Sequence, residues 1–201
     1  MRKVIGIIGG NGVAATNKLN ELLELEFTKN GAFRDCHHPE IITYQATKAP
    51  SRSMFLEGRG DSFVPDYIAI AKKLKQCGAS KLCMCCNTAH YAIDEIAKKA
   101  NIPFINLIEE VAKEVKKRKC HKVGLMVSDG CLKHRIYDKY FNKICPSVEI
   151  VYPDDEYQKL VTQGICNVKN PYRFDSKNSK NRAHNIFKKV SRHLLNVMGG
   201  G

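Results

Sequence analysis

The chain has 201 residues, of which 43% are hydrophobic and 26% are charged. These are ordinary values for a folded globular protein, and they exclude a wholly disordered chain. No apolar run approaches the length of a membrane span, and the start lacks the apolar region and cleavage site of a signal peptide. Nine cysteines, an odd number, are typical of reduced thiols, so we expect a soluble cytoplasmic protein.

The formal net charge is +13, and the basic residues concentrate in 113–122 and 169–192. Neither stretch contains zinc-finger spacing, an aromatic RNA-binding strand or a helix-turn-helix pattern. The composition therefore favours lysine-rich solvated surfaces over a nucleic-acid partner. A positive field would still help to attract an anionic substrate.

Strand-like runs alternate with helical patterns along the chain. The predicted strands are 3–8, 41–45, 81–85, 104–107, 122–127 and 148–151, and the predicted helices are 14–30, 64–77, 88–100, 108–119, 132–144, 155–168 and 180–197. Such alternation predicts parallel sheets flanked by helices. We therefore expect an α/β fold of two similar lobes, residues 1–112 and 113–201, with a site in the cleft between them. The long stretch 46–63, which contains Gly and Ser, is the one extended loop that we expect, and in a compact enzyme such a loop is typical of a binding loop or a lid.

Candidate ligand-binding residues follow the predicted strands. In open parallel sheets, ligands bind at the carboxyl ends of the strands. Gly10 and Asn11 follow the first strand, Arg52 comes after the second, Cys86 after the third and Gly130 after the fifth.

The segment Cys86-Asn87-Thr88-Ala89-His90 is the most informative of these. It places a thiol, an amide and a hydroxyl where a strand should run into a helix beginning near Thr88. The free N–H groups and dipole of a helix start favour a thiolate and also attract a carboxylate. From the residues alone, Cys86 remains open between a functional role and packing.

Two other interpretations of these segments, as a dinucleotide-binding site and as a metal site, have less support from the sequence. Gly10-x-Gly12-x-x-Ala15 matches a dinucleotide-binding pattern, but the second predicted strand ends in 44–48 without the carboxylate that would hold a ribose. A metal site formed by Cys83, Cys85 and Cys86 is also possible. However, one strand cannot wrap a tetrahedral ion, and buried cysteines usually act as small hydrophobes. We therefore expect no metal site.

Several segments together resemble the aspartate/glutamate racemase family of cofactor-independent amino-acid racemases, and its aspartate racemase branch in particular. Residues 4–10 resemble the family's opening strand and glycine turn, and 86–90 resembles its first-cysteine motif. Asn101-Ile102-Pro103-Phe104, Lys122-Val123-Gly124-Leu125 and Tyr137 then follow in the expected order.

The resemblance implies an activity without a cofactor, in which thiols transfer the Cα proton of aspartate or glutamate. Cys86 would be one of two catalytic thiols, and Asn87 and Thr88 would hold the α-carboxylate. Arg52 would pair with a carboxylate, and Lys169 resembles a family lysine near the site. The remaining expected substrate-binding residues are Gly10, Asn11, Gly130 and Cys131. The resemblance also implies a homodimer.

The family's second thiol lies in a Gly-Cys-Thr-Glu motif, which these 201 residues do not contain. We therefore expect the second lobe to stop before its last strand, with reduced stability. Cys131 is the one internal candidate for a second acid, and its alternative is a tolerated replacement of a hydroxyl contact. Three hypotheses stay open: an aspartate racemase-like enzyme, a one-thiol relative that binds or isomerises the same ligand, and a non-catalytic basic binding protein.

Overall fold

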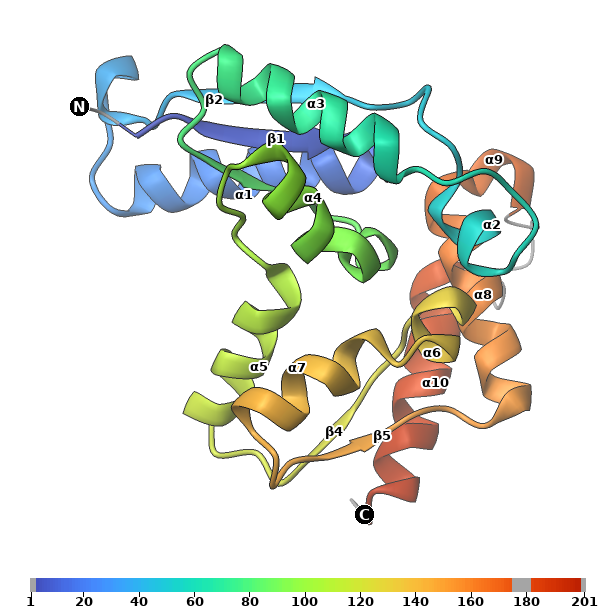
Figure 1. The fold of residues 1–201 in the computed structure, drawn as a ribbon. Coiled ribbons are helices and arrows are strands. Elements are labelled where there is room, and N and C mark those ends of the chain that lie inside the picture. The colour runs from blue at the N-terminus through green and yellow to red at the C-terminus, as the bar shows by residue number, and fades with distance from the viewer. Residues whose placement is uncertain (1–2, 175–181, 200–201) are drawn as a thin grey trace. The chain divides into compact units, whose positions relative to one another are not determined.

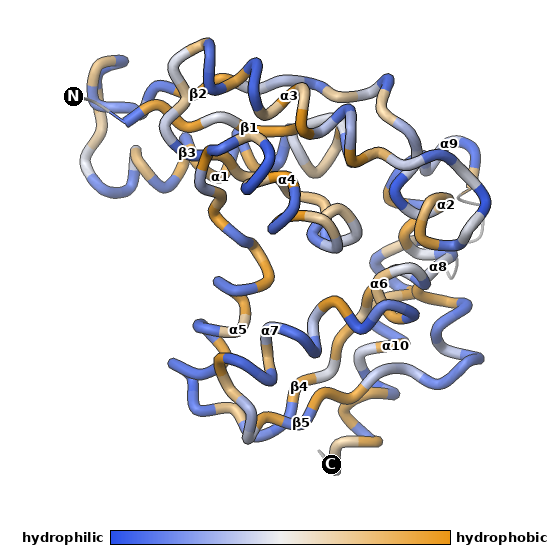
Figure 2. The backbone as a smooth tube through the Cα atoms, in the orientation of Figure 1, coloured by the Kyte–Doolittle hydropathy of each residue, from blue (hydrophilic) through white to orange (hydrophobic). Residues whose placement is uncertain are grey.

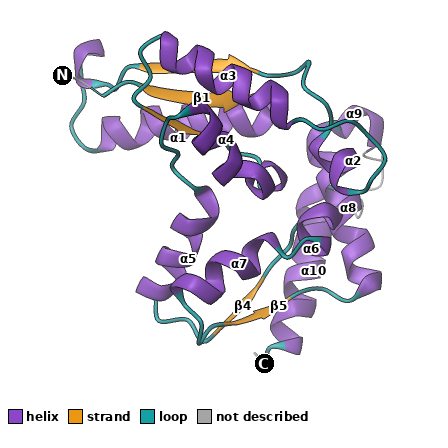
Figure 3. Ribbon diagram, viewed as in Figure 1, coloured by secondary structure: helices purple, strands orange, loops and turns teal. Residues whose placement is uncertain are grey.

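A computed structural model of the protein describes residues 3–174 and 182–199. The chain divides into two compact units, Met1–Glu110 and Val111–Gly201, and the division falls within helix α5 (Leu107–Lys117). Both units contain parallel strands flanked by helices (Figure 3), so the predicted α/β class is confirmed.

The first unit is built on a three-stranded parallel sheet. Its strands are β1 (Ile5–Gly9), β2 (Ile41–Gln45) and β3 (Lys81–Cys83), in the order β2-β1-β3. The central strand β1 is buried from its second residue onward and is mostly hydrophobic along its length (Figure 2), as a strand paired on both edges requires. All three strands therefore end at one edge of the sheet.

Helices accompany the strands of this unit, and α1 and α3 run alongside the sheet (Figure 1). They are α1 (Val13–Lys29), α2 (Arg52–Leu56), α3 (Val64–Gln76) and α4 (Ile93–Ala100), with short 3₁₀ helices η1 (Asp35–His37) and η2 (Thr88–Ala92). Helix α3 buries Val64, Tyr67, Ala71 and Leu74, spaced three and four residues apart, so one apolar face contacts the core.

The second unit contains a two-stranded parallel sheet, β4 (Lys122–Gly124) and β5 (Glu149–Val151). Its helices are α6 (Asp129–Lys133), α7 (Ile136–Ile144), α8 (Asp155–Lys169), α9 (Pro171–Phe174) and α10 (Ala183–Val197). Helices α8 and α10 pack together through Val161, Val190 and Leu194. Among the described residues, no helix is long and apolar enough to cross a membrane.

Several predicted elements differ from the structure. The strand 104–107 is only a single bridge between Phe104 and Leu82, because Asn106 caps the following helix with its side-chain oxygen. The helix 132–144 is two helices, since Ser128 starts a turn earlier and Arg135 adopts a left-handed conformation. The loop 46–63 contains the short helix α2, which Ser51 caps. The predicted helix 180–197 begins at Ala183, and its first two residues lie outside the described ranges.

Candidate active site

The turn after β1 requires glycine at position 10. Gly10 has a φ of +75°, and a Cβ added there would lie 2.7 Å from the backbone nitrogen of Ala46. The Gly10 N–H donates to the hydroxyl of Thr16 at 3.1 Å, and this hydroxyl donates to the carbonyl of Gly12 at 3.0 Å. These contacts hold the turn against the start of α1.

Asn11, the next residue of this turn, is 7% exposed. Its side-chain amide donates to the carbonyl of Ile8 at 3.1 Å, and its side-chain oxygen lies 3.9 Å from the thiol of Cys85. The turn after β1 therefore reaches the segment that follows β3, as the shared edge of the parallel strands predicts.

The segment around Cys86 differs from its predicted geometry. Strand β3 ends at Cys83, so Cys85 and the half-buried Cys86 lie beyond it. The predicted α-helix 88–100 begins as the 3₁₀ helix η2, and α-helical geometry starts only at Ile93. One short 3₁₀ turn has a small dipole compared with a full α-helix, so the helix-start argument for a thiolate at Cys86 is weaker than the sequence indicated. Thr88 opens η2 and is buried, and Asn87 directly precedes it.

His90 holds this segment in place. Its Nε2 accepts a hydrogen bond from the backbone N–H of Leu107 at 3.1 Å, so the proton of the neutral ring sits on Nδ1, which donates to the carbonyl of Cys86 at 2.8 Å. Burial lowers the pKa of His90, although the bond to the Cys86 carbonyl opposes this shift. The histidine is therefore neutral and ties the backbone of Cys86 to the start of α5.

Arg52 is the first residue of α2 and is partly buried. Its Nη1 donates to the carbonyl of Pro50 at 3.0 Å, whereas its Nε is buried and has no hydrogen-bond partner among the described residues. A guanidinium with an unused buried donor suits a carboxylate ligand.

Sequence reasoning missed Tyr67, which lies on the buried face of α3. The residue is fully buried, and its hydroxyl also makes no hydrogen bond of ordinary geometry within the described ranges. Burial raises the pKa of Tyr67 to about 12, and charges on Cys86 and Cys85 add to this rise. The charge of Arg52 and a hydrogen-bonding interaction with the nearby side chain of Asn11 act against it. The one signal in the sequence is a tyrosine within an otherwise apolar helical face, which by itself points only to packing.

The structure thus brings Asn11, Arg52, Tyr67 and Cys86 together within the first unit. The other predicted residues belong to the second unit. Gly130 and Cys131 are buried in the first turn of α6, and Lys169 is the exposed last residue of α8. Their roles stay predictions.

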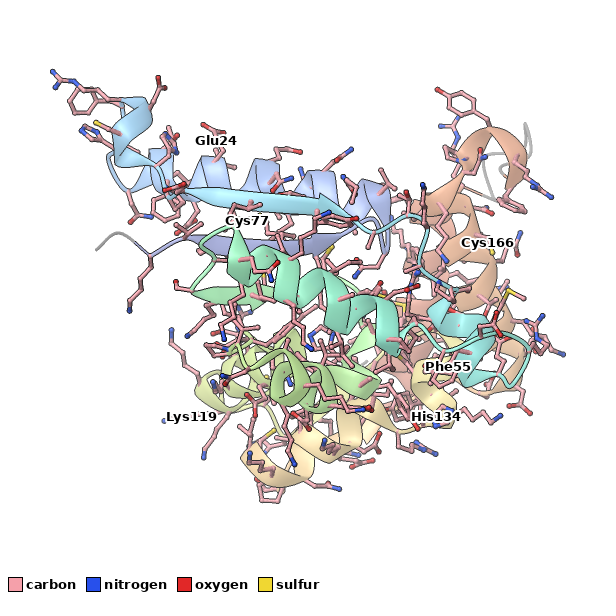
Figure 4. The ribbon with its side chains drawn as sticks, turned by 45° about the horizontal axis from the view of Figure 1, so that its top comes forward. Glu24, Phe55, Cys77, Lys119, His134 and Cys166 are labelled. Carbon is pink, nitrogen blue, oxygen red and sulfur yellow. The ribbon has the colours of Figure 1, made fainter. Side chains whose placement is uncertain are left out.

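Other cysteines do not share these surroundings. Burial, with a smaller contribution from Cys85, raises the pKa of Cys83 to about 11. Cys77 caps the end of α3 and is exposed (Figure 4). No three His, Cys, Asp or Glu side chains within the described ranges are arranged to hold a metal ion.

A parallel α/β unit with a thiol after its third strand and a partly buried arginine in the same unit is the arrangement expected of an amino-acid racemase, a type of isomerase. The profile of the Asp/Glu/hydantoin racemase family matches residues 5–195. The chain therefore belongs to this family.

Individual relatives agree with this assignment. The structure of an aspartate racemase from Picrophilus torridus superposes with a TM-score of 0.76 at 26% identity, covering 97% of this chain and 75% of that one. An aspartate racemase homologue from Pyrococcus horikoshii OT3 has a TM-score of 0.70 at 25% identity, covering 100% of this chain and 82% of that one. Among curated proteins, the broad specificity amino-acid racemase RacX of Bacillus subtilis (strain 168) is 24% identical over 169 residues, which are 84% of this chain and 72% of RacX.

Proposed function

We propose that the protein binds aspartate or a similar dicarboxylic amino acid and that Cys86 transfers its Cα proton without a cofactor. One observation carries the proposal: the Cys86 segment shares its surroundings with Arg52, whose buried Nε has no partner among the described residues. Arg52 and the half-buried thiol of Cys86 both act on the pKa of Tyr67, so one unit would supply a carboxylate-binding group and an acid/base close to the same residue.

The chemistry requires strong stabilisation because a Cα proton is only weakly acidic. The Cys86 thiolate would take this proton while Asn87 and Thr88 hold the α-carboxylate, where negative charge develops. Arg52 would hold the other carboxylate and so orient the Cα–H bond toward the sulfur. The thiol then returns the proton, or a deuteron from solvent, to Cα.

Solvent exchange in heavy water tests this proposal. With Cys86 as the one assigned acid/base, we expect the Cα proton of a single aspartate enantiomer to exchange, as followed by proton NMR. Cys86→Ala should abolish the exchange, and Cys77→Ala, which removes an exposed thiol, is the matched control. Equal exchange of both enantiomers with full interconversion would show that a second acid acts on the opposite face of Cα.

The breadth of the substrate range is part of the same test. Two of the similar structures are named for aspartate, whereas RacX is named for broad specificity. We propose a dicarboxylic substrate because Arg52 supplies a cation for a second carboxylate. Faster exchange of alanine or another neutral amino acid than of aspartate and glutamate would contradict this choice.

The family resemblance also supports a homodimer, which we propose as the assembled form. Analytical ultracentrifugation of the 201-residue chain would measure it, and a monomer at micromolar concentration would exclude it.

A further inference from the structure

We infer that Tyr67 is a further substrate-binding residue, whose hydroxyl donates a hydrogen bond to the side-chain carboxylate of the amino acid. This inference rests on the proposed function and names a contact for the second carboxylate of the substrate, the one not attached to Cα.

The burial of Tyr67 is the first observation. The side chain is 0% exposed, and its hydroxyl makes no hydrogen bond of ordinary geometry within the described ranges. The side chain of Asn11 lies close enough to lower the pKa of Tyr67, but its amide already donates to the carbonyl of Ile8 at 3.1 Å. A polar group buried in this way destabilises the folded chain, and the large majority of such groups in proteins are paired. Phenylalanine would fill the same space without this cost, so packing alone does not explain a tyrosine.

The surroundings of the hydroxyl are the second observation. Arg52 supplies a positive charge near it, and the Nε of Arg52 is likewise buried without a partner within the described ranges. Two unused donors beside one positive charge match the acceptor oxygens and negative charge of a carboxylate. With a pKa of about 12, the phenol keeps its proton at neutral pH and acts as a donor.

A run of aromatic contacts fixes the hydroxyl in place. The ring of Tyr67 meets Phe63 edge-on at 5.1 Å between centroids, Phe63 meets Phe55 at 5.6 Å, and Phe55 meets Tyr91 at 6.4 Å. Phe55 lies on α2 (Figure 4), the helix that begins with Arg52. These contacts therefore link the helix that carries Arg52 to the helix that carries Tyr67, and the two donors are positioned before a ligand binds.

The position of the hydroxyl selects which carboxylate it contacts. Asn87 and Thr88 directly follow Cys86 in the chain, so they are the groups suited to the α-carboxylate next to the reacting Cα. Arg52 and Tyr67 come from α2 and α3, and they share the second carboxylate. A neutral amino acid such as alanine has no group for this pair.

Protection of Cys86 from alkylation by iodoacetamide measures the binding, with mass spectrometry reporting modified Cys86. For Tyr67→Phe we expect aspartate to protect with roughly 10- to 100-fold lower affinity, the value of one hydrogen bond to a charged group. Any protection by alanine should change less than twofold. Urea unfolding should show an unchanged or raised stability, because the variant removes an unpaired hydroxyl. Tyr140→Phe, at a buried tyrosine of the second unit, is the control and should leave aspartate affinity unchanged.

The outcomes separate this inference from the proposed function. If aspartate and glutamate fail to protect wild-type Cys86, the proposed function fails and the inference fails with it. If they protect the wild type and Tyr67→Phe equally, the inference alone is overturned. A weaker affinity accompanied by a clear loss of stability would show a structural role instead, and an equal loss for alanine would move the contact to the α-carboxylate.

Discussion

Replacing Gly10 by alanine should destabilise the protein more than the same change at Gly58. Both glycines have a φ of +75°, so alanine at either position carries the left-handed backbone strain of about 1–2 kcal/mol. The space around them differs. A Cβ at Gly58 would have no other atom within 4 Å, whereas at Gly10 it would lie 2.7 Å from the nitrogen of Ala46 and 3.0 Å from the carbonyl carbon of Gln45.

The close backbone contact at Gly10 determines how much more stability Gly10→Ala should lose than Gly58→Ala. The atoms near Gly10 belong to the backbone at the end of β2, where the N–H of Ala46 donates a hydrogen bond to the carbonyl of Gly9 at 2.9 Å. These backbone atoms therefore cannot move without separating β1 from β2. Overpacking of this kind adds about 1–3 kcal/mol. We therefore expect Gly58→Ala to lower the free energy of unfolding by about 1–2 kcal/mol and Gly10→Ala by about 2–5 kcal/mol.

Equilibrium unfolding in urea, followed by circular dichroism, measures both variants against the wild type. Gly10→Ala should also weaken protection of Cys86 by aspartate, because the turn carries Asn11 toward the Cys86 segment. Equal losses of stability at the two positions would refute the reasoning, since it would mean that the close backbone contact at Gly10 has no energetic consequence.

Two further predictions follow from burial. Burial lowers the pKa of His90, so below about pH 6.5 the unfolded chain binds a proton that the folded chain excludes. The free energy of unfolding should therefore decrease as the pH falls. Urea titrations between pH 7.5 and 5.5 should show a shallower decrease for His90→Gln than for the wild type. The thiol of Cys83, with a pKa of about 11, is ionised to about one part in a thousand at pH 8. Peptide mapping after alkylation should therefore find Cys83 modified at least roughly 100-fold more slowly than the exposed Cys77. Comparable alkylation rates for the two cysteines would contradict the burial of the Cys83 thiol.

Local patterns explain how much of the fold was predictable. The bounds of β2 match the predicted 41–45, and α3 and α8 end within one residue of their predicted ends, because hydrophobic periodicity is a property of neighbouring residues. The failures occur where a distant or capping contact overrides that periodicity. At 88–100, the ring of His90 donates a hydrogen bond to the Cys86 carbonyl and accepts one from the N–H of Leu107, and the segment begins as a 3₁₀ helix.

Part of the candidate site could likewise be predicted from local sequence patterns. Cys86, Asn87, Thr88, Gly10, Asn11 and Arg52 could be named from a motif, from glycine spacing and from their places after predicted strands. A motif is contiguous, so it survives in a single sequence without any knowledge of packing. The same local signals were enough to indicate the racemase family, which the match over residues 5–195 confirms.

The role inferred for Tyr67 depends on contacts that no sequence window contains. Its neighbours come from the turn after β1, from α2 and from the segment after β3, and Phe55 and Phe63 hold it there. In the sequence it is one more large residue on the apolar face of a helix. A buried hydroxyl without a well-formed hydrogen bond, close to a guanidinium, becomes visible only in the folded chain, because burial and hydrogen-bond pairing are properties of residues that meet in space.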